Sequence, residues 1–189
     1  LPRQPPTYVG LRAARSLNEM LMRGFTTVRD AGGADFGLAR AIDEGFIVGP
    51  RLLYCGKALS PSGGHGDLRG PGVEHEDEVY PYVSLGRRAD GVAAVRAAAR
   101  DEIHKGAHHI KIMANGGISS QTDRITSDQY SEEEIAAVVD EAAMANLYVM
   151  AHTYTARSVA RAVRNGVRSI EHGNLLDEPT LALMKEHGA

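Results

Sequence analysis

The chain alternates between short apolar runs and longer segments in which apolar residues recur every three or four positions. The longer segments have the spacing of amphipathic helices, and a glycine follows most of them, where helices commonly end. Ser131, with Glu134 three residues later, forms a capping box that opens one of these helices. We therefore expect helices over residues 8–22, 36–44, 91–105, 132–145, 156–165 and 179–187.

The short apolar runs between these helices predict strands. Because strands and helices alternate along the chain, right-handed crossover connections would place the strands in a parallel sheet. No Gly-x-Gly-x-x-Gly follows the first strand, so a dinucleotide-binding fold lacks its fingerprint. The pattern fits either an open doubly wound sheet or most of a (β/α)8 barrel, with strands over residues 25–30, 51–55, 110–114, 147–154 and 167–173.

The region from Lys57 to about Ala89 has neither pattern and is rich in glycine and proline. We expect it to be one long irregular segment. Loops of that length are uncommon in compact domains and usually line or cover a site.

Lys111 stands inside an apolar strand, between Ile110 and Ile112. Strand alternation places His109, Lys111 and Met113 on one face, and a parallel sheet covered on both sides would remove water from the lysine amine. Its pKa would then fall, leaving a neutral amine that can act as a base, a nucleophile or a carbon dioxide acceptor. The alternative is a lysine whose stem packs in the sheet while its tip reaches solvent.

Several polar side chains follow the ends of the predicted strands, where the catalytic groups of parallel-sheet proteins collect. His152 and Tyr154 share a strand face, and His172 ends the next strand. Imidazole nitrogens suit zinc and related divalent ions, although a single buried histidine is more often a hydrogen-bonding structural residue. The same location holds Asp30, His65 and Asn115. Asp30 and Asn115 could orient ligands or stabilise turns.

Composition excludes several classes of partner. The 189 residues carry 21 basic and 24 acidic side chains, and the net charge of -3 gives no broad basis for binding nucleic acid or an anionic membrane. No apolar run is long enough to span a bilayer. Cys55 is the only cysteine, which excludes an internal disulfide, predicts a small buried residue and favours a cytoplasmic location.

Five segments together resemble the metal-dependent amidohydrolase superfamily, in its imidazolonepropionase-like and prolidase-like (Xaa-Pro or related dipeptidase) branch. They lie in the family's order over almost the whole chain, at residues 24–33, 63–67, 110–117, 151–154 and 170–173, and read GFTTVRDAGG, GGHGD, IKIMANGG, AHTY and IEHG. The resemblance implies a (β/α)8 TIM barrel, present here as about strands 2 to 6. The chain is then one partial domain over residues 1–189, without the first strand, the last two strands or any flanking β-sandwich.

The resemblance also assigns residues to roles. It implies that Lys111 is carboxylated and bridges two zinc ions, and that His152 and His172 ligate the second metal. His65 and Tyr154 would reach the substrate and stabilise the oxyanion. The implied reaction is hydrolysis of the amide bond of a dipeptide or N-acyl amino acid by a metal-bound hydroxide, and the partner is that small molecule. A homo-oligomer is compatible with this interpretation.

The chain departs from the family pattern in two places. It contains no His-x-His and no counterpart of the family's eighth-strand aspartate, so this stretch alone is expected to be inactive. Three alternatives stay open: a cyclic-amide hydrolase of the imidazolone type, a catalytically silent α/β scaffold or binding subunit, and a phosphate-binding barrel with its anion loop at residues 115–117. The remaining histidines are expected in loops or on solvated helix ends: His75, His104, His108, His109 and His187.

Overall fold

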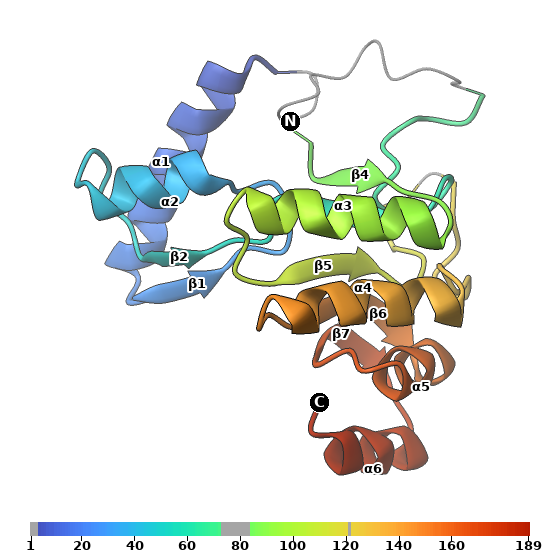
Figure 1. The fold of residues 1–189 in the computed structure, drawn as a ribbon. Coiled ribbons are helices and arrows are strands. Elements are labelled where there is room, and N and C mark those ends of the chain that lie inside the picture. The colour runs from blue at the N-terminus through green and yellow to red at the C-terminus, as the bar shows by residue number, and fades with distance from the viewer. Residues whose placement is uncertain (1–3, 73–83, 121) are drawn as a thin grey trace.

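The computed structural model describes residues 4–72, 84–120 and 122–189 of the chain, and Figure 1 shows its elements. Helices and strands alternate over most of the chain, as the periodicity predicts. In chain order they are α1 (Pro6–Met22), β1 (Thr27–Arg29), α2 (Phe36–Asp43), β2 (Arg51–Leu53), β3 (Ala58–Ser60), β4 (Gly86–Arg88), α3 (Val92–His104), β5 (Ile110–Met113), α4 (Glu132–Met144), β6 (Val149–Thr155), α5 (Ala156–Arg164), β7 (Ser169–Leu175) and α6 (Glu178–His187).

Every pairing between the named strands is parallel. β1 and β2 form a two-stranded sheet, and five strands form a second sheet in the order β4-β3-β5-β6-β7. This arrangement confirms the predicted parallel α/β class. Among the described residues, no helix is both long and apolar enough to cross a membrane.

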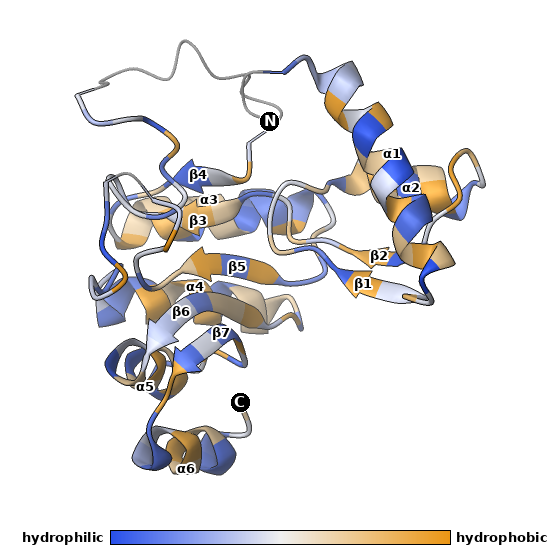
Figure 2. Ribbon diagram, turned by 180° about the vertical axis from the view of Figure 1, so that it is seen from behind, coloured by the Kyte–Doolittle hydropathy of each residue, from blue (hydrophilic) through white to orange (hydrophobic). Residues whose placement is uncertain are grey.

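The larger sheet has an apolar face and a polar face. Ile110 and Ile112 of β5 pack into a buried core with α3 and α4, which cover that side of the sheet in Figure 1. Figure 2 shows the opposite side, where loops gather at the ends of β5, β6 and β7. Lys111 alternates with the two isoleucines and therefore belongs to this second face.

The predicted capping box at the start of α4 is confirmed. The side chain of Ser131 accepts a hydrogen bond from the backbone N–H of Glu134, and the Glu134 carboxylate accepts one from the backbone N–H of Ser131. Both groups would otherwise be unsatisfied at the first turn of the helix. The helix therefore begins where the sequence predicts.

The prediction of one irregular segment from Lys57 to Ala89 is wrong at both ends. Residues 58–60 form β3 and residues 86–88 form β4, and the two pair with each other in parallel. Each strand is only three residues long, and β4 reads Gly-Arg-Arg, so neither shows an apolar run. Their pairing depends on neighbours distant in sequence, which local periodicity does not detect. His75 lies outside the described residues.

Candidate active site

Lys111 is buried in the middle of β5. Its exposed fraction is 2%, and burial lowers the pKa of its amine to about 8. β5 pairs in register with β6, so that Lys111 lies opposite Met150 and Met113 lies opposite His152. Partners opposite each other in a parallel pair share a face, and His152 is therefore on the same face as the lysine. The alternative of a lysine tip in solvent is wrong.

Three aromatic side chains gather beside this lysine. The ring centroid of His152 lies 5.0 Å from that of Tyr154 and 4.7 Å from that of His172. Tyr154 and His172 stack at 4.7 Å. The structure therefore brings together the residues that the sequence predicts on two separate strands.

His172 reaches this cluster through an unusual backbone conformation. The register pairs Thr153 with His172 and His152 with Glu171, so simple alternation would direct the His172 side chain away from His152. His172 has a φ of 82°, in the left-handed region that non-glycine residues seldom adopt. A register irregularity between β6 and β7 follows it. This local distortion re-aims the imidazole, as bulges beside functional sites commonly do.

Burial and neighbouring charge lower the pKa of both imidazoles, which favours their neutral forms. His152 is 3% exposed, and burial, together with His65 and Lys111, lowers its pKa to about 3. The pKa of His172 is also lowered, first by burial and then by Lys111. A neutral imidazole offers a lone pair, which is the form that binds a metal.

The hydrogen bond of His152 identifies its free nitrogen. Nε2 of His152 lies 3.3 Å from the carbonyl oxygen of Gly116. A carbonyl only accepts, so Nε2 carries the hydrogen and Nδ1 keeps its lone pair. This is the arrangement that backbone carbonyls impose on metal-ligating histidines.

His65 enters the site from the loop after β3. Its ring stacks on His152 with centroids 4.1 Å apart, and its Nδ1 lies 2.6 Å from the hydroxyl oxygen of Ser120. The side-chain oxygen of Gln129 accepts a hydrogen bond from the His65 backbone N–H at 3.1 Å. Burial lowers the pKa of His65. All five predicted site residues therefore belong to one neighbourhood.

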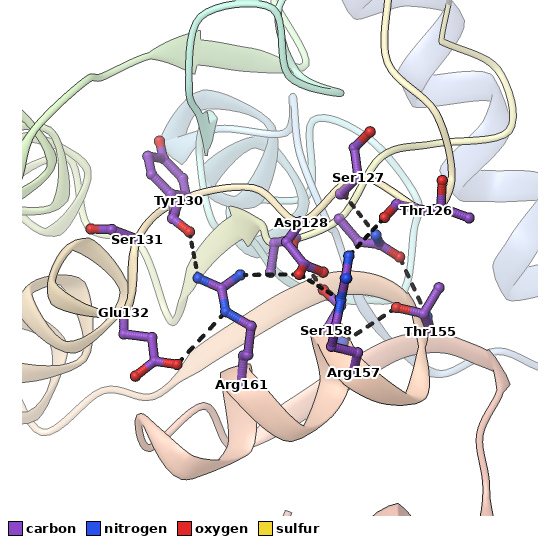
Figure 3. Close-up of polar contacts among 12 residues, drawn as sticks. Thr126, Ser127, Asp128, Tyr130, Ser131, Glu132, Thr155, Arg157, Ser158 and Arg161 are labelled. Carbon is purple, nitrogen blue, oxygen red and sulfur yellow. Dashed lines mark hydrogen bonds and ion pairs between the residues drawn. The ribbon is translucent and has the colours of Figure 1, made fainter.

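The loop that precedes α4 is tied to α5, and Figure 3 shows these contacts. Arg161 donates to the carbonyl of Tyr130 at 2.9 Å, and Arg157 pairs with Asp128 at 2.8 Å. The side chain of Asn115 donates to the carbonyl of Ser127 at 2.9 Å and accepts from the backbone N–H of Tyr154 at the same distance. Asn115 thus joins this loop to the strand that carries Tyr154.

The structure confirms the prediction for Cys55, gives Asp30 one of its two predicted roles, and contradicts the prediction for His109. Cys55 is fully buried, and burial raises the pKa of its thiol to about 12, as expected for a structural residue. The carboxylate of Asp30 accepts from the backbone N–H groups of Gly32 and Ala34, which is the turn role. The surface prediction for His109 is wrong, because this side chain is fully buried. Its Nε2 lies 3.0 Å from the Asp30 carbonyl.

The phosphate-loop alternative loses one of its donors. The backbone N–H of Gly116 donates to the carbonyl of Ser127 at 2.9 Å and is not directed at a ligand. An anion loop requires free N–H groups that converge on the bound group. The turn at residues 115–117 instead serves to hold the site loops together.

Sequence reasoning missed three contacts at the site. Ser120 and Gln129 lie in a polar loop without periodicity, and only a hydroxyl or amide near a glycine turn could have marked them. Arg29 of β1 pairs with Glu171 of β7 at 3.3 Å, although 142 residues separate them. No local signal reports a pair so distant in sequence.

The buried lysine and its histidines fit a divalent metal centre only with additional ligands. Within residues 4–72, 84–120 and 122–189, no group of three or more His, Cys, Asp or Glu side chains could hold a metal ion. His152 and His172 supply two imidazole donors. A carbamate on Lys111 would add oxygen donors, and nitrogen with oxygen ligands is a set that zinc accepts. The residues present therefore fit part of a metal centre.

The fold and this cluster define the class of protein: a portion of a (β/α)8 barrel whose polar residues lie at the carboxyl ends of its strands. The chain belongs to the amidohydrolase family, whose model matches residues 3–189. This finding confirms the resemblance drawn from the five sequence segments.

Three individual relatives add detail to the family assignment. The chain is 39% identical over 192 residues to ochratoxinase of Aspergillus niger, covering 97% of this chain and 40% of the relative. A crystal structure of a prolidase complexed with N-methylphosphonate-L-proline is 55% identical, with a TM-score of 0.94 over 98% of this chain and 46% of that chain. A Xaa-Pro dipeptidase with bound methionine in its active site is 33% identical, with a TM-score of 0.85 over the same shares of the two chains. The chain thus spans less than half the length of each of these relatives.

Proposed function

We propose that this chain supplies the central part of a binuclear zinc amidohydrolase that cleaves the amide bond of a dipeptide or N-acyl amino acid. The observation that supports this most is the amine of Lys111, 2% exposed, on the same sheet face as His152. Prolidase and ochratoxinase relatives support the substrate class. The ligands bound in two related structures, N-methylphosphonate-L-proline and methionine, are small and carry a carboxylate.

Lys111, His152 and His172 would hold the metal ions. The neutral amine of Lys111 would combine with carbon dioxide and release a proton, and the resulting carbamate would present two oxygen ligands. Nδ1 of His152 is the nitrogen left free by the Gly116 carbonyl, and His172 faces His152 across 4.7 Å between ring centroids. When bound, the two cations would polarise the scissile carbonyl and lower the pKa of the attacking water.

His65 and Tyr154 would act on the substrate oxygen. The Tyr154 ring is held between two contacts, edge-on to His152 and stacked on His172, and its backbone N–H is fixed by Asn115. Its hydroxyl and the His65 imidazole are the donors assigned to the developing oxyanion. A fixed donor costs no reorganisation when charge develops, which is why such groups contribute to rate.

The direct test uses the full-length protein that contains this chain. Purified protein is assayed for zinc content and for hydrolysis of Xaa-Pro dipeptides, N-acyl amino acids and an imidazolone. We expect two zinc ions per chain and turnover of a carboxylate-bearing amide, and expect both to be lost in Lys111→Ala. A folded, metal-free protein without turnover would instead establish the silent scaffold, and turnover of the imidazolone alone would establish the cyclic-amide alternative.

A second experiment tests the carbamate. Metal-free full-length protein is reconstituted with zinc in carbon-dioxide-free buffer, with and without added bicarbonate. A carboxylated Lys111 requires bicarbonate for recovery of activity. Equal recovery in both buffers would show that the lysine acts as a plain amine.

A further inference from the structure

The segment from Gly116 to Ser120 contacts two imidazoles of the site at once. The Gly116 carbonyl accepts the Nε2 hydrogen of His152, and the Ser120 hydroxyl lies 2.6 Å from Nδ1 of His65. The inference below concerns Ser120 and rests on the proposed function, in which His65 donates a hydrogen bond to the substrate oxygen.

The backbone of this segment is shaped to receive the His65 ring. A Cβ atom on Gly117 would overlap Nδ1 and Cε1 of His65, so any larger residue here would displace the imidazole. The same ring stacks on His152. The backbone N–H of His65 is held separately by Gln129. The ring is thereby confined on several sides, with Nδ1 turned toward Ser120.

The direction of the hydrogen bond follows from the partners that are present. Nδ1 of a neutral imidazole can either donate to the hydroxyl or accept from it. Within the described residues, the Ser120 hydroxyl has His65 as its only hydrogen-bond partner. Its hydrogen is therefore best placed on the line to Nδ1, which makes the imidazole nitrogen the acceptor.

We propose that Ser120 is a positioning residue that fixes His65 in the tautomer with hydrogen on Nε2, so that this nitrogen donates to the substrate oxygen. A neutral imidazole carries one ring hydrogen, and a hydrogen on Nδ1 would leave Nε2 with a lone pair directed at the developing negative charge. Ser120 therefore acts through His65 and does not itself touch the substrate. Its contribution appears in the transition state, where charge develops on that oxygen.

The kinetic test compares three variants of the zinc-loaded full-length protein. Ser120→Ala removes the hydroxyl and should lower kcat about 10- to 100-fold, the range for loss of a group that orients a site histidine, while KM changes little. Ser120→Thr keeps a hydroxyl and should restore most of the lost rate. Ser119→Ala, at the exposed neighbouring serine, is the matched control and should keep the rate of the unmodified protein.

A second measurement reads the tautomer without any need for turnover. The protein is labelled with 15N in its histidine rings, the His65 signals are assigned by their absence in His65→Gln, and the ring nitrogens are observed by long-range 1H–15N correlation. We expect Nδ1 of His65 to be unprotonated, and expect the spectrum of Ser120→Ala to show a mixture of the two tautomers.

The two measurements separate this inference from the proposed function. A protein that hydrolyses none of the amides but shows Nδ1 unprotonated would contradict the proposed function and leave intact only the assignment of the His65 tautomer by Ser120. Hydrogen on Nδ1 in the unmodified protein would overturn the role of Ser120 whatever the activity. The same conclusion follows if Ser120→Thr is as slow as Ser120→Ala, or if Ser120→Ala is as fast as Ser119→Ala.

Discussion

At the scale of single residues, burial of a charged group decides the chemistry of the site. Lys111 loses nearly all contact with water, and its pKa falls from 10.5 to about 8 because the ammonium form is poorly solvated. The same lysine lowers the pKa values of His65, His152 and His172. Burial is the larger cause at all three imidazoles, and the charge of the ammonium form of Lys111 adds to it.

The cost of burying Lys111 predicts a pH-dependent stability. Between pH 8 and 10.5 the unfolded chain binds a proton at this lysine and the folded chain does not, so the free energy of unfolding should rise with pH through this window. The Lys111→Met variant lacks this lysine, so its free energy of unfolding should not show this rise with pH. Below pH 8 the variant should be more stable by about 3.5 kcal/mol, because the pKa shift of about 2.5 corresponds to about 1.4 kcal/mol for each unit.

Urea unfolding of the metal-free full-length protein, in buffer without carbon dioxide, measures this difference at pH 7, 8, 9 and 10. Parallel pH profiles for the two proteins would show that Lys111 titrates as an ordinary surface lysine.

Gly117 offers a second test at a single position. In Gly117→Ala the added Cβ would displace the His65 ring, and kcat should fall by about 100-fold or more, as for loss of an oxyanion donor. Gly10→Ala is the matched control, because a Cβ at this position of α1 meets no atom within 4 Å. Hydrolysis assays of both variants test this prediction. Equal kcat values for the two variants would show that His65 does not take part in the reaction.

The positions of Lys111, His152 and Tyr154 were predictable from sequence because strand alternation is a local property. The same alternation places His109 on the Lys111 face, so its assignment to a loop went against the local pattern. Its partners have no local signal, because nothing near it in sequence shows that Tyr148 stacks on its ring and that Asp30 accepts its hydrogen bond. The placement of His172 was predicted, but its backbone conformation was not. A left-handed φ at a histidine has no signal in the pattern of apolar residues.

At the scale of elements, capping and periodicity made the helices predictable. α4 begins at Glu132, directly after the predicted N-cap Ser131, and α3 and α5 end one residue before the predicted limits. Strands of three residues were missed where no apolar run marks them, as in β3 and β4. Their existence depends on the neighbouring strands that satisfy their backbone groups, and β3 lies between β4 and β5.

The capping box at α4 predicts a stability effect. Ser131→Ala should lower the free energy of unfolding by about 1 kcal/mol, because the backbone N–H of Glu134 loses its acceptor. Ser131→Thr retains a capping oxygen and should cost less. Both values come from urea unfolding monitored by circular dichroism, and an alanine variant as stable as the threonine variant would contradict the assignment.

At the scale of the whole molecule, a metal centre would connect strands that are far apart in sequence. Lys111 lies on β5, His152 on β6 and His172 on β7. An ion held by all three binds the folded chain and not the unfolded one, so binding adds to stability by mass action.

Removal of zinc should therefore destabilise the full-length protein. At a free zinc concentration a thousandfold above the dissociation constant, the added stability is about 4 kcal/mol, and a chelator should remove it. His152→Ala should melt at the same temperature with or without zinc. Calorimetry of the zinc-loaded and chelated forms measures the shift, and an unchanged melting temperature in the unmodified protein would contradict a metal centre in this chain.

The short segment that contacts both His152 and His65 also restricts how this protein can change during evolution. A substitution at residues 116–120 that moves the backbone shifts both rings together. A change that improves the position of one imidazole therefore worsens the position of the other. Variation in substrate preference should therefore accumulate at side chains that project from the segment, such as the 74%-exposed Ile118, rather than at Gly117, where a Cβ would overlap the His65 ring. A library that randomises Ile118 should yield altered selectivity far more often than one that randomises Gly117.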